Sequence, residues 1–298
     1  MPSLGGNDRI YVTTTIIKET KMSKTVFITG AQSGTGYGIA ELFARQGFDV
    51  VITGLIGDEA RAAAKSLSQK YGVRSIGYGL DLRSEQQITD VFREIDSSGL
   101  CVDTLVLNAA DMALEDDPSK GIDLWSLSTQ TFKRVLETNI IGNFTLAREA
   151  ALRMRERKHG AIVFISSNSV YRANPNREAY IASKGGINAL AKSLAVDLGP
   201  FGIRCNVIMP GTIKTERWVK MGKKQISNGE LTPIGDISDF EDIANAAFFL
   251  GTDMSKNITG AELTVDGGMS CQIYPAILPE LKRIRDAYEE LKGENQNG

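Results

Sequence analysis

The sequence predicts an α/β fold, in which a single domain is built on a doubly wound, mostly parallel sheet of seven strands. Three observations support this prediction. Short runs rich in Val, Ile and Leu recur along the chain, several of these runs are almost entirely apolar, and segments with helical periodicity separate them. Such strands must be covered on both faces, as in a parallel sheet. A repeated strand–helix order gives a doubly wound sheet whose ligands lie beyond the carboxyl ends of the strands.

Each element is expected from its own pattern, taken in chain order. The apolar runs begin with VFIT and VVIT and end with ELTV, and they predict strands at 26–29, 50–53, 75–80, 104–107, 161–166, 204–209 and 262–265. The stretches between them have apolar residues at helical spacing, and they predict helices at 39–46, 59–71, 85–96, 131–157, 179–198 and 240–250.

Three segments depart from this repeat. Residues 1–21 precede a second methionine, Met22, and are interpreted as an N-terminal extension that is possibly disordered, with the folded domain expected over 22–272. Residues 273–298 form a C-terminal tail with a charged, helix-like pattern. An irregular stretch at 211–238 follows the sixth strand, where a loop of that length is more often a lid or a binding element than padding.

Composition limits the kinds of function. The 298 residues carry a formal net charge of −2 without a run of Lys or Arg interleaved with aromatic residues, which argues against nucleic acid or an anionic membrane as partner. No apolar run is long enough to span a membrane. The single histidine, His159, excludes multi-histidine metal sites, and no metal is expected. Three widely spaced cysteines fit a reducing, cytoplasmic location. We therefore expect a small-molecule substrate.

A glycine-rich turn follows the first expected strand. The chain there is Gly30-Ala31-Gln32-Ser33-Gly34-Thr35-Gly36, followed by the first expected helix, which starts near Ile39. Glycines let backbone amides approach a pyrophosphate at a helix N-terminus, where the helix dipole favours negative charge. Glycines also simply make tight turns, but a position between the first strand and the first helix favours dinucleotide binding.

Two other strand ends have candidate contacts with open alternatives. Asp81, just past the third strand, either accepts a hydrogen bond from an adenine amino group or caps the helix near Ser84. Asn108 and Ala109 follow the fourth strand. They either let the chain pass close beneath a cofactor or serve tight packing alone.

Tyr180 and Lys184 are four residues apart on an expected helix, and they therefore share one face. A free phenol has a pKa of about 10, and a cation roughly 4 Å away supplies up to about 4 kcal/mol at an effective dielectric of about 20. The ammonium is thus expected to lower the phenol pKa by up to about three pH units, with desolvation opposing part of the gain. Such pairs also occur by chance on solvated helix faces. Here Ser166 and Ser167 end the fifth strand nearby, and Ser167 is placed to hydrogen-bond a substrate oxygen.

These motifs, in this order, resemble the short-chain dehydrogenase/reductase family, in its single-domain branch, over about residues 24 to 270. The family's glycine motif, Tyr-x3-Lys pair and serine fall on Thr29, Gly30, Gly34, Gly36, Tyr180, Lys184 and Ser167. Asn139 matches the fourth member of the catalytic tetrad, which holds a water on the proton-relay path. The resemblance implies a Rossmann fold and hydride transfer between NAD or NADP and a carbonyl or secondary alcohol, with Tyr180 as general acid and base.

The resemblance also implies which residues hold the cofactor. Pro210-Gly211-Thr212-Ile213 is similar to the family's turn beside the nicotinamide carboxamide, and Val265-Asp266-Gly267-Gly268 matches its C-terminal signature. The expected cofactor contacts are Gly30, Gln32, Ser33, Gly34, Thr35, Gly36, Asp81, Leu82, Asn108, Ala109, Tyr180, Lys184, Pro210, Gly211, Thr212, Ile213 and Thr215.

Two departures from the family pattern bear on these expectations. The usual Asn-Asn-Ala-Gly appears as Leu107-Asn108-Ala109-Ala110, which alters the support of the fold without removing a catalytic residue. After the second strand the family carries an acidic residue for NAD or a basic one for NADP, whereas Gly54 and Leu55 supply neither. Ser33 stands where many NADP users carry a basic residue, which tilts the choice slightly to NAD.

The sequence leaves the substrate and one competing function open. Substrate contacts are expected from Ser167, Asn168, Tyr171 and, in the irregular stretch, Trp218, but sugars, polyols, oxoacyl thioesters and steroids all fit. The alternative is a dinucleotide-binding regulatory protein of the same fold that does no chemistry. Most members of the family assemble through the helices that correspond to 131–157 and 179–198, so the resemblance implies a homodimer or homotetramer.

Overall fold

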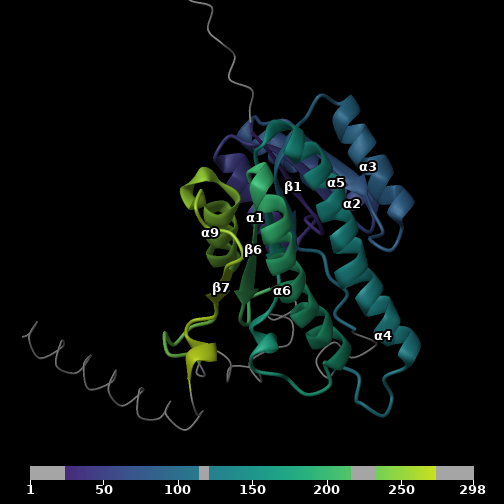
Figure 1. Ribbon diagram of the computed structural model, residues 1–298, viewed down its shortest axis with the longest axis vertical. Helices are drawn as coiled ribbons and strands as arrows, with labels where there is room; N and C mark the ends of the chain where they lie inside the picture. The colour runs from purple at the N-terminus through teal and green to yellow at the C-terminus, as the bar shows by residue number, and fades with distance from the viewer. Residues whose placement is uncertain (1–23, 114–120, 216–231, 273–298) are drawn as a thin grey trace, which may run out of the picture.

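Seven parallel strands form one sheet in the order β3-β2-β1-β4-β5-β6-β7. The computed structural model describes residues 24–113, 121–215 and 232–272 (Figure 1). The strands are β1 (Thr25–Ile28), β2 (Asp49–Gly54), β3 (Ser75–Gly79), β4 (Val102–Leu107), β5 (Gly160–Ile165), β6 (Ile203–Pro210) and β7 (Glu262–Val265). The predicted single-domain α/β fold is therefore confirmed. Every strand pair is parallel.

Helices cover both faces of the sheet, because the strand residues alternate between two buried clusters. Phe27 packs with side chains from α3, α5 and α6, whereas its neighbours Val26 and Ile28 pack with α1, α2 and α9. Fully burying one such side chain contributes roughly 1.5–3 kcal/mol. The helices are α1 (Gly34–Arg45), α2 (Gly57–Tyr71), α3 (Glu85–Ser97), α4 (Thr129–Leu136), α5 (Asn143–Arg157), α6 (Glu178–Leu198) and α9 (Phe240–Gly251). In Figure 1, β6 lies between α6 and α9. None of the described helices has a stretch long and apolar enough to cross a lipid bilayer.

The single helix predicted over 131–157 is wrong in one respect. A π-helical turn at Glu137–Gly142 separates α4 from α5. At Gly142 a Cβ atom would lie 2.4 Å from the carbonyl oxygen of Leu82, so the π-helical turn meets the turn after β3 at a point where only glycine fits. Such π-helical turns are frequently found at functional sites, and this one contains Asn139.

The sheet places the candidate residues at one edge. The strands β1 and β4 are neighbours, and the strands that follow each of them in the chain lie on opposite sides of this pair. A crevice therefore forms between β1 and β4 at the carboxyl ends of the strands. The irregular stretch after β6 is anchored at both ends, since Ile213 pairs with Ser238 in an isolated bridge. The N-terminal extension, the C-terminal tail beyond residue 272, and residues 216–231, which include Trp218, lie outside the described residues.

Candidate active site

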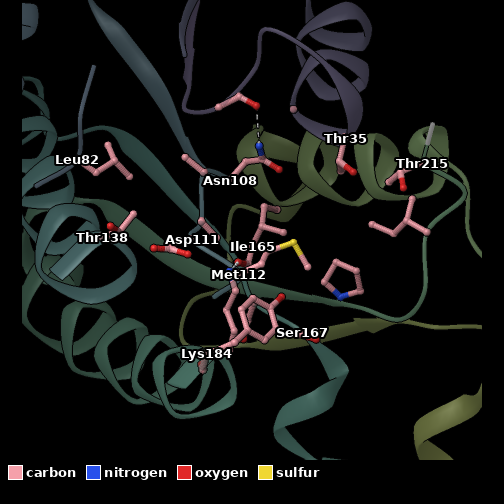
Figure 2. A pocket seen from close by; sticks show the side chains of 18 of the residues that line it. Thr35, Leu82, Asn108, Asp111, Met112, Thr138, Ile165, Ser167, Lys184 and Thr215 are labelled. Carbon is pink, nitrogen blue, oxygen red and sulfur yellow. Dashed lines mark hydrogen bonds between the residues drawn. The ribbon is translucent and has the colours of Figure 1, made fainter. Parts of the chain in front are cut away.

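A cavity of about 950 Å³ lies at the carboxyl edge of the sheet (Figure 2). Turns after each of the first six strands contribute to its lining. The expected residues that line it are Gly30, Gln32, Ser33, Thr35, Gly36, Asp81, Leu82, Asn108, Ala109, Ser167, Asn168, Tyr180, Lys184, Pro210, Gly211, Thr212, Ile213 and Thr215. This volume lies at the upper end of the range that is usual for ligand pockets.

Three expected residues lie elsewhere. Gly34, the first residue of α1, does not line this cavity but a smaller one beside it. Tyr171 is 57% exposed and its hydroxyl donates to Glu262, away from the cavity, so its expected substrate contact is not found. Asn139 is buried and is not part of the lining. Among the described residues, no three His, Cys, Asp or Glu side chains are clustered to hold a metal ion.

The glycine-rich turn is packed so tightly that side chains are excluded from it. At Gly36 a Cβ atom would lie 2.4 Å from the carbonyl oxygen of Gly30 and 2.6 Å from Nδ2 of Asn108. Ser33 is the N-cap residue of α1, yet its side chain makes no capping hydrogen bond, and the first turn of α1 has no acidic residue. The first backbone N–H groups of α1 are thus left for an anion, which the helix dipole favours at this end.

Thr29 and Asn108 join the glycine-rich turn to β4. The Thr29 Oγ1 accepts from the backbone N–H groups of Asn108 and Ala109, at 3.0 and 3.1 Å. The Asn108 Nδ2 donates to the carbonyl oxygens of Thr29 and Gly30, also at 3.0 and 3.1 Å. Asn108 therefore has a structural role as well as a place in the lining. In Figure 2, Asn108 and Thr35 lie across the cavity from Lys184 and Ser167.

Asp81 does not cap a helix. Ser84 is the N-cap of α3, since its side chain accepts from the Gln87 N–H. The Asp81 carboxylate instead pairs with Arg83 at 2.6 Å, and this guanidinium lowers the carboxyl pKa below its usual value. The capping alternative is therefore excluded, while Asp81 keeps its place at the cavity wall.

Lys184 is buried beneath the Tyr180 ring. Its Nζ lies 5.5 Å from the centroid of that ring and donates to the carbonyl oxygen of Ile165 at 2.7 Å. The side chain is only 2% exposed, and this burial lowers the pKa of Lys184 to about 8. The helical spacing thus brings the two side chains together, as expected.

The effect on the phenol differs from the expectation. Desolvation raises the pKa of the Tyr180 phenol, a hydrogen bond with Ser167 and the positive charge of Arg177 oppose that rise, and the Lys184 ammonium is not among the groups that lower it. The predicted ammonium effect is wrong for this structure. The reason is geometric, because Nζ faces the ring and is engaged by the Ile165 carbonyl, and burial itself weakens its charged form.

Ser169 orients Ser167. The Ser167 Oγ accepts from the Ser169 hydroxyl at 2.8 Å and from the Ser169 N–H at 3.2 Å. A hydroxyl oxygen has two lone pairs, so both are occupied and the Ser167 O–H is left as a donor toward the phenol or a substrate. Sequence reasoning missed Ser169. Its signal was present, since it lies two residues beyond the serine that was singled out.

Asn139 connects two elements of the site without touching the cavity. Its Oδ1 accepts from the Asp111 N–H at 2.7 Å, and its Nδ2 donates to the Asp111 carbonyl at 2.8 Å and to the Ser183 Oγ at 2.9 Å. The Ser183 hydroxyl donates in turn to the Tyr180 carbonyl at 2.7 Å. Asn139 therefore fixes the turn after β4 relative to the helix that carries Tyr180.

Charged residues that the sequence reasoning missed line the substrate side. Asp111 pairs with Arg134 at 2.8 Å, and Arg177 is the N-cap residue of α6, just before Tyr180. Asp111 directly follows the small residues after β4, and Arg177 precedes α6. Their signal was charge next to turns that had already been identified, but which of these charges faces inward depends on the folded chain.

Known proteins are similar to this chain in sequence over most of its length. The family model described as enoyl-(acyl carrier protein) reductase matches residues 30–270. A 3-oxoacyl-(acyl-carrier-protein) reductase of Aquifex aeolicus is 32% identical over 247 residues, which cover 83% of this chain and 97% of that protein. An L-rhamnose 1-dehydrogenase (NAD(P)(+)) of Azotobacter vinelandii is 34% identical over 262 residues, with coverage of 83% and 97%.

A solved structure agrees with the same assignment. The crystal structure of a 3-oxoacyl-(acyl-carrier protein) reductase with bound NAD from Brucella melitensis superposes with a TM-score of 0.75 at 28% identity, covering 83% of this chain and 91% of the other. The glycine-rich turn, the serine and the Tyr–Lys pair occupy one cavity here, and the relatives span more than four fifths of the chain. The chain therefore belongs to the short-chain dehydrogenase/reductase family, the NAD(P)-dependent oxidoreductases that act on CH–OH and C=O groups.

Proposed function

We propose that Tyr180, Ser167 and Lys184 are the catalytic centre for interconversion of a carbonyl group and a secondary alcohol on a small molecule. One observation supports this most directly. The Tyr180 phenol, the Ser167 hydroxyl and the buried Lys184 ammonium line one cavity together with the glycine-rich turn, and Lys184 Nζ lies 5.5 Å from the centroid of the Tyr180 ring. A bound NAD or NADP would supply the hydride chemistry, while these three residues would hold the substrate oxygen and its proton.

The residues present fit a dinucleotide. The turn from Gly30 to Gly36 is held tightly, since a Cβ atom at Gly36 would collide with the Gly30 carbonyl oxygen and Asn108, and the uncapped start of α1 suits a pyrophosphate. Pro210, Gly211 and Ile213 line the same cavity as Tyr180 and Lys184, and we propose that they hold the nicotinamide end. Lys184 has N–H groups beyond the one used by Ile165, and we assign one of them to the nicotinamide ribose.

Tyr180 and Ser167 divide the proton chemistry between them. Because desolvation raises the phenol pKa, Tyr180 stays protonated near neutral pH and is ready to donate its proton to the oxygen of a carbonyl substrate. Ser167 donates its remaining O–H to the same oxygen as negative charge develops there. Asn139 uses its whole side chain to hold Asp111 and Ser183, so that side chain is not available to hold the relay water expected from the resemblance.

The pKa values of this centre predict how reduction depends on pH. The buried Lys184 has a pKa of about 8, so its ammonium is present below that pH and is lost above it. We expect kcat/KM for carbonyl reduction to fall as pH rises through about 8, since kcat/KM reports groups of the free enzyme. The phenol does not cause this fall, because its pKa is raised above the usual value of about 10.

A pH profile of kcat/KM between about pH 6 and pH 10 measures this fall. In Lys184→Arg the guanidinium stays charged, so any activity that is retained should not decline near pH 8. Lys192→Gln is the matched control, because Lys192 lies about two turns further along α6 and pairs with Glu262 at 2.6 Å. A wild-type profile that is flat through about pH 9.5 would contradict the assignment of Lys184.

The proposed function is tested by cofactor titration followed by a substrate screen. The purified protein should quench or enhance the fluorescence of NADH or NADPH on binding, and absorbance of the reduced cofactor should then fall with at least one ketone, keto sugar or oxoacyl thioester. Binding without turnover across such a panel would instead favour the regulatory dinucleotide-binding alternative. Failure of both cofactors to bind would sink the proposal.

The oligomeric state is also proposed. The outer surfaces of the π-helical turn, α5 and α6 expose large apolar side chains, namely Ile141, Phe144, Leu152 and Val196, and Ile141 is 58% exposed. Exposed apolar side chains on neighbouring helices suit a subunit interface. We propose a homodimer or homotetramer that buries these faces, and light scattering that gives the mass of one chain would exclude it.

A further inference from the structure

Gln32 extends over Gly54 in an unusual way. A Cβ atom at Gly54 would lie 2.9 Å from both Cδ and Oε1 of Gln32, so the amide occupies the space where a side chain at position 54 would begin. Gln32 Oε1 is buried, and it has no hydrogen-bond donor among the described residues. An unsatisfied buried oxygen costs about 1–3 kcal/mol, which marks this amide as a group that lacks its partner.

The position of this amide identifies the missing partner. Gln32 belongs to the turn that would bind the pyrophosphate, and Gly54 ends β2. In dinucleotide-binding sheets the adenosine ribose lies at the end of the second strand, where an acceptor about 20 residues after the glycine turn binds its 2′-hydroxyl. Gly54 has no side chain with which to do this.

We propose that the amide oxygen of Gln32 accepts the hydrogen bond from the 2′-hydroxyl of the adenosine ribose, and that it makes NAD the preferred cofactor. The inference rests on the proposed function and deepens it. No hydrogen bond holds Oε1 in its buried position, so rotation about the last torsion of the side chain turns it toward the cavity without breaking one. That terminal torsion is broad in glutamine.

The charges at this end of the cavity favour a hydroxyl over a phosphate. The described lining residues from the glycine-rich turn and the end of β2 are uncharged, namely Gly30, Gln32, Ser33, Thr35, Gly36, Thr53, Gly54 and Leu55. Among the residues that line the cavity, the positively charged one closest in sequence to the end of β2 is Arg83. Its guanidinium already pairs with the Asp81 carboxylate at 2.6 Å. A 2′-phosphate would therefore have to break an existing ion pair to gain a positive partner.

The first test replaces the amide and measures binding of each cofactor directly. Gln32→Met keeps the length of the side chain but removes the acceptor. The Kd of NADH should rise about five- to tenfold, as for loss of one hydrogen bond, while the Kd of NADPH changes less than about twofold. Gln46→Met is the control, because Gln46 is exposed at the end of α1 and both Kd values should stay unchanged. Thermal unfolding of each variant without cofactor checks that the fold is intact.

The second test moves the acceptor to position 54. Gly54→Asp alone forces its Cβ atom against Gln32, whereas Gln32→Ala with Gly54→Asp gives the carboxylate room. The double variant should bind NADH at least about tenfold more tightly than Gln32→Ala alone, because a charged acceptor makes the stronger hydrogen bond. It should also bind NADPH more weakly, because the carboxylate repels the 2′-phosphate.

These measurements separate this inference from the proposed function. Wild-type protein that binds neither cofactor would overturn the proposed function itself. Wild-type protein that binds NADPH more tightly than NADH would overturn only the inference about Gln32. Equal losses for both cofactors in Gln32→Met, no loss for either, or a double variant no better than Gln32→Ala would overturn it as well.

Discussion

Tyr180→Phe should lower kcat for carbonyl reduction by about a hundred- to ten-thousandfold, the range that a positioned general acid contributes. The substitution removes the proton that Tyr180 would donate but keeps the ring that lies over the Lys184 ammonium. Cofactor affinity should therefore stay near that of the wild type. Single-turnover kinetics measure the loss in the chemical step, and a fluorescence titration with NADH measures the affinity.

The chain offers a matched control for this variant. Tyr171→Phe removes a phenolic hydroxyl nine residues earlier, where it donates to Glu262 outside the cavity, and it should leave kcat within about twofold of the wild type. Full activity of Tyr180→Phe would refute its assignment as general acid and base. If Tyr180→Phe lost both activity and thermal stability, Tyr180 would have a structural role instead. Retained NADH affinity in this variant would exclude that explanation.

The sheet could be predicted from sequence because its pattern is local. Val26, Phe27 and Ile28 are all buried, since successive strand residues face different helix layers, and a run of apolar residues is the direct result. The first helix is predicted over 39–46, whereas α1 begins earlier, at Gly34, because the last glycines of the turn form its first helical turn. The predicted strands agree with the observed ones to within a few residues, because turns and polar residues bound each apolar run.

The break between α4 and α5 could not be predicted, because it depends on a contact between distant parts of the chain. Residues 131–157 have continuous helical periodicity, yet Gly142 meets the carbonyl of Leu82 and Asn139 reaches Asp111. A helical pattern indicates which face of a helix is buried. It does not indicate that the helix must change its hydrogen-bond spacing so that the Asn139 side chain can bind the turn at Asp111, 28 residues earlier.

In the candidate site, too, local patterns could be predicted from the sequence, whereas contacts between distant residues could not. Tyr180, Lys184 and Ser167 could be selected because their residue types and spacing are unusual together, and the folded chain places them in one cavity. The sign of the phenol pKa shift could not be predicted, since it depends on the balance between desolvation and the direction of the ammonium. The orientation of Ser167 by Ser169 also requires the turn geometry after β5.

Gly36→Ala should lower the free energy of unfolding by about 1–3 kcal/mol and weaken NADH binding at least about tenfold. In an ordinary helix the same change stabilises by about 0.5–1 kcal/mol, because alanine restricts the unfolded chain and favours helix. Here the new methyl group would lie 2.4 Å from the Gly30 carbonyl oxygen and 2.9 Å from the Cα of Ala31, so backbone atoms must move. The turn that would hold the pyrophosphate moves with them. Denaturant unfolding and an NADH titration measure the two losses.

Gly185→Ala makes the sign of this prediction testable. Gly185 lies inside α6, and no heavy atom comes within 4 Å of a Cβ atom built there, so this variant should gain stability as a helical glycine does. The two substitutions have the same chemistry and opposite expected signs, which isolates the close approach at Gly36 from helix propensity. If Gly36→Ala also gained stability and bound NADH as the wild type does, the glycine-rich turn would have space for a side chain. The close packing of this turn, on which the proposed dinucleotide binding depends, would then be refuted.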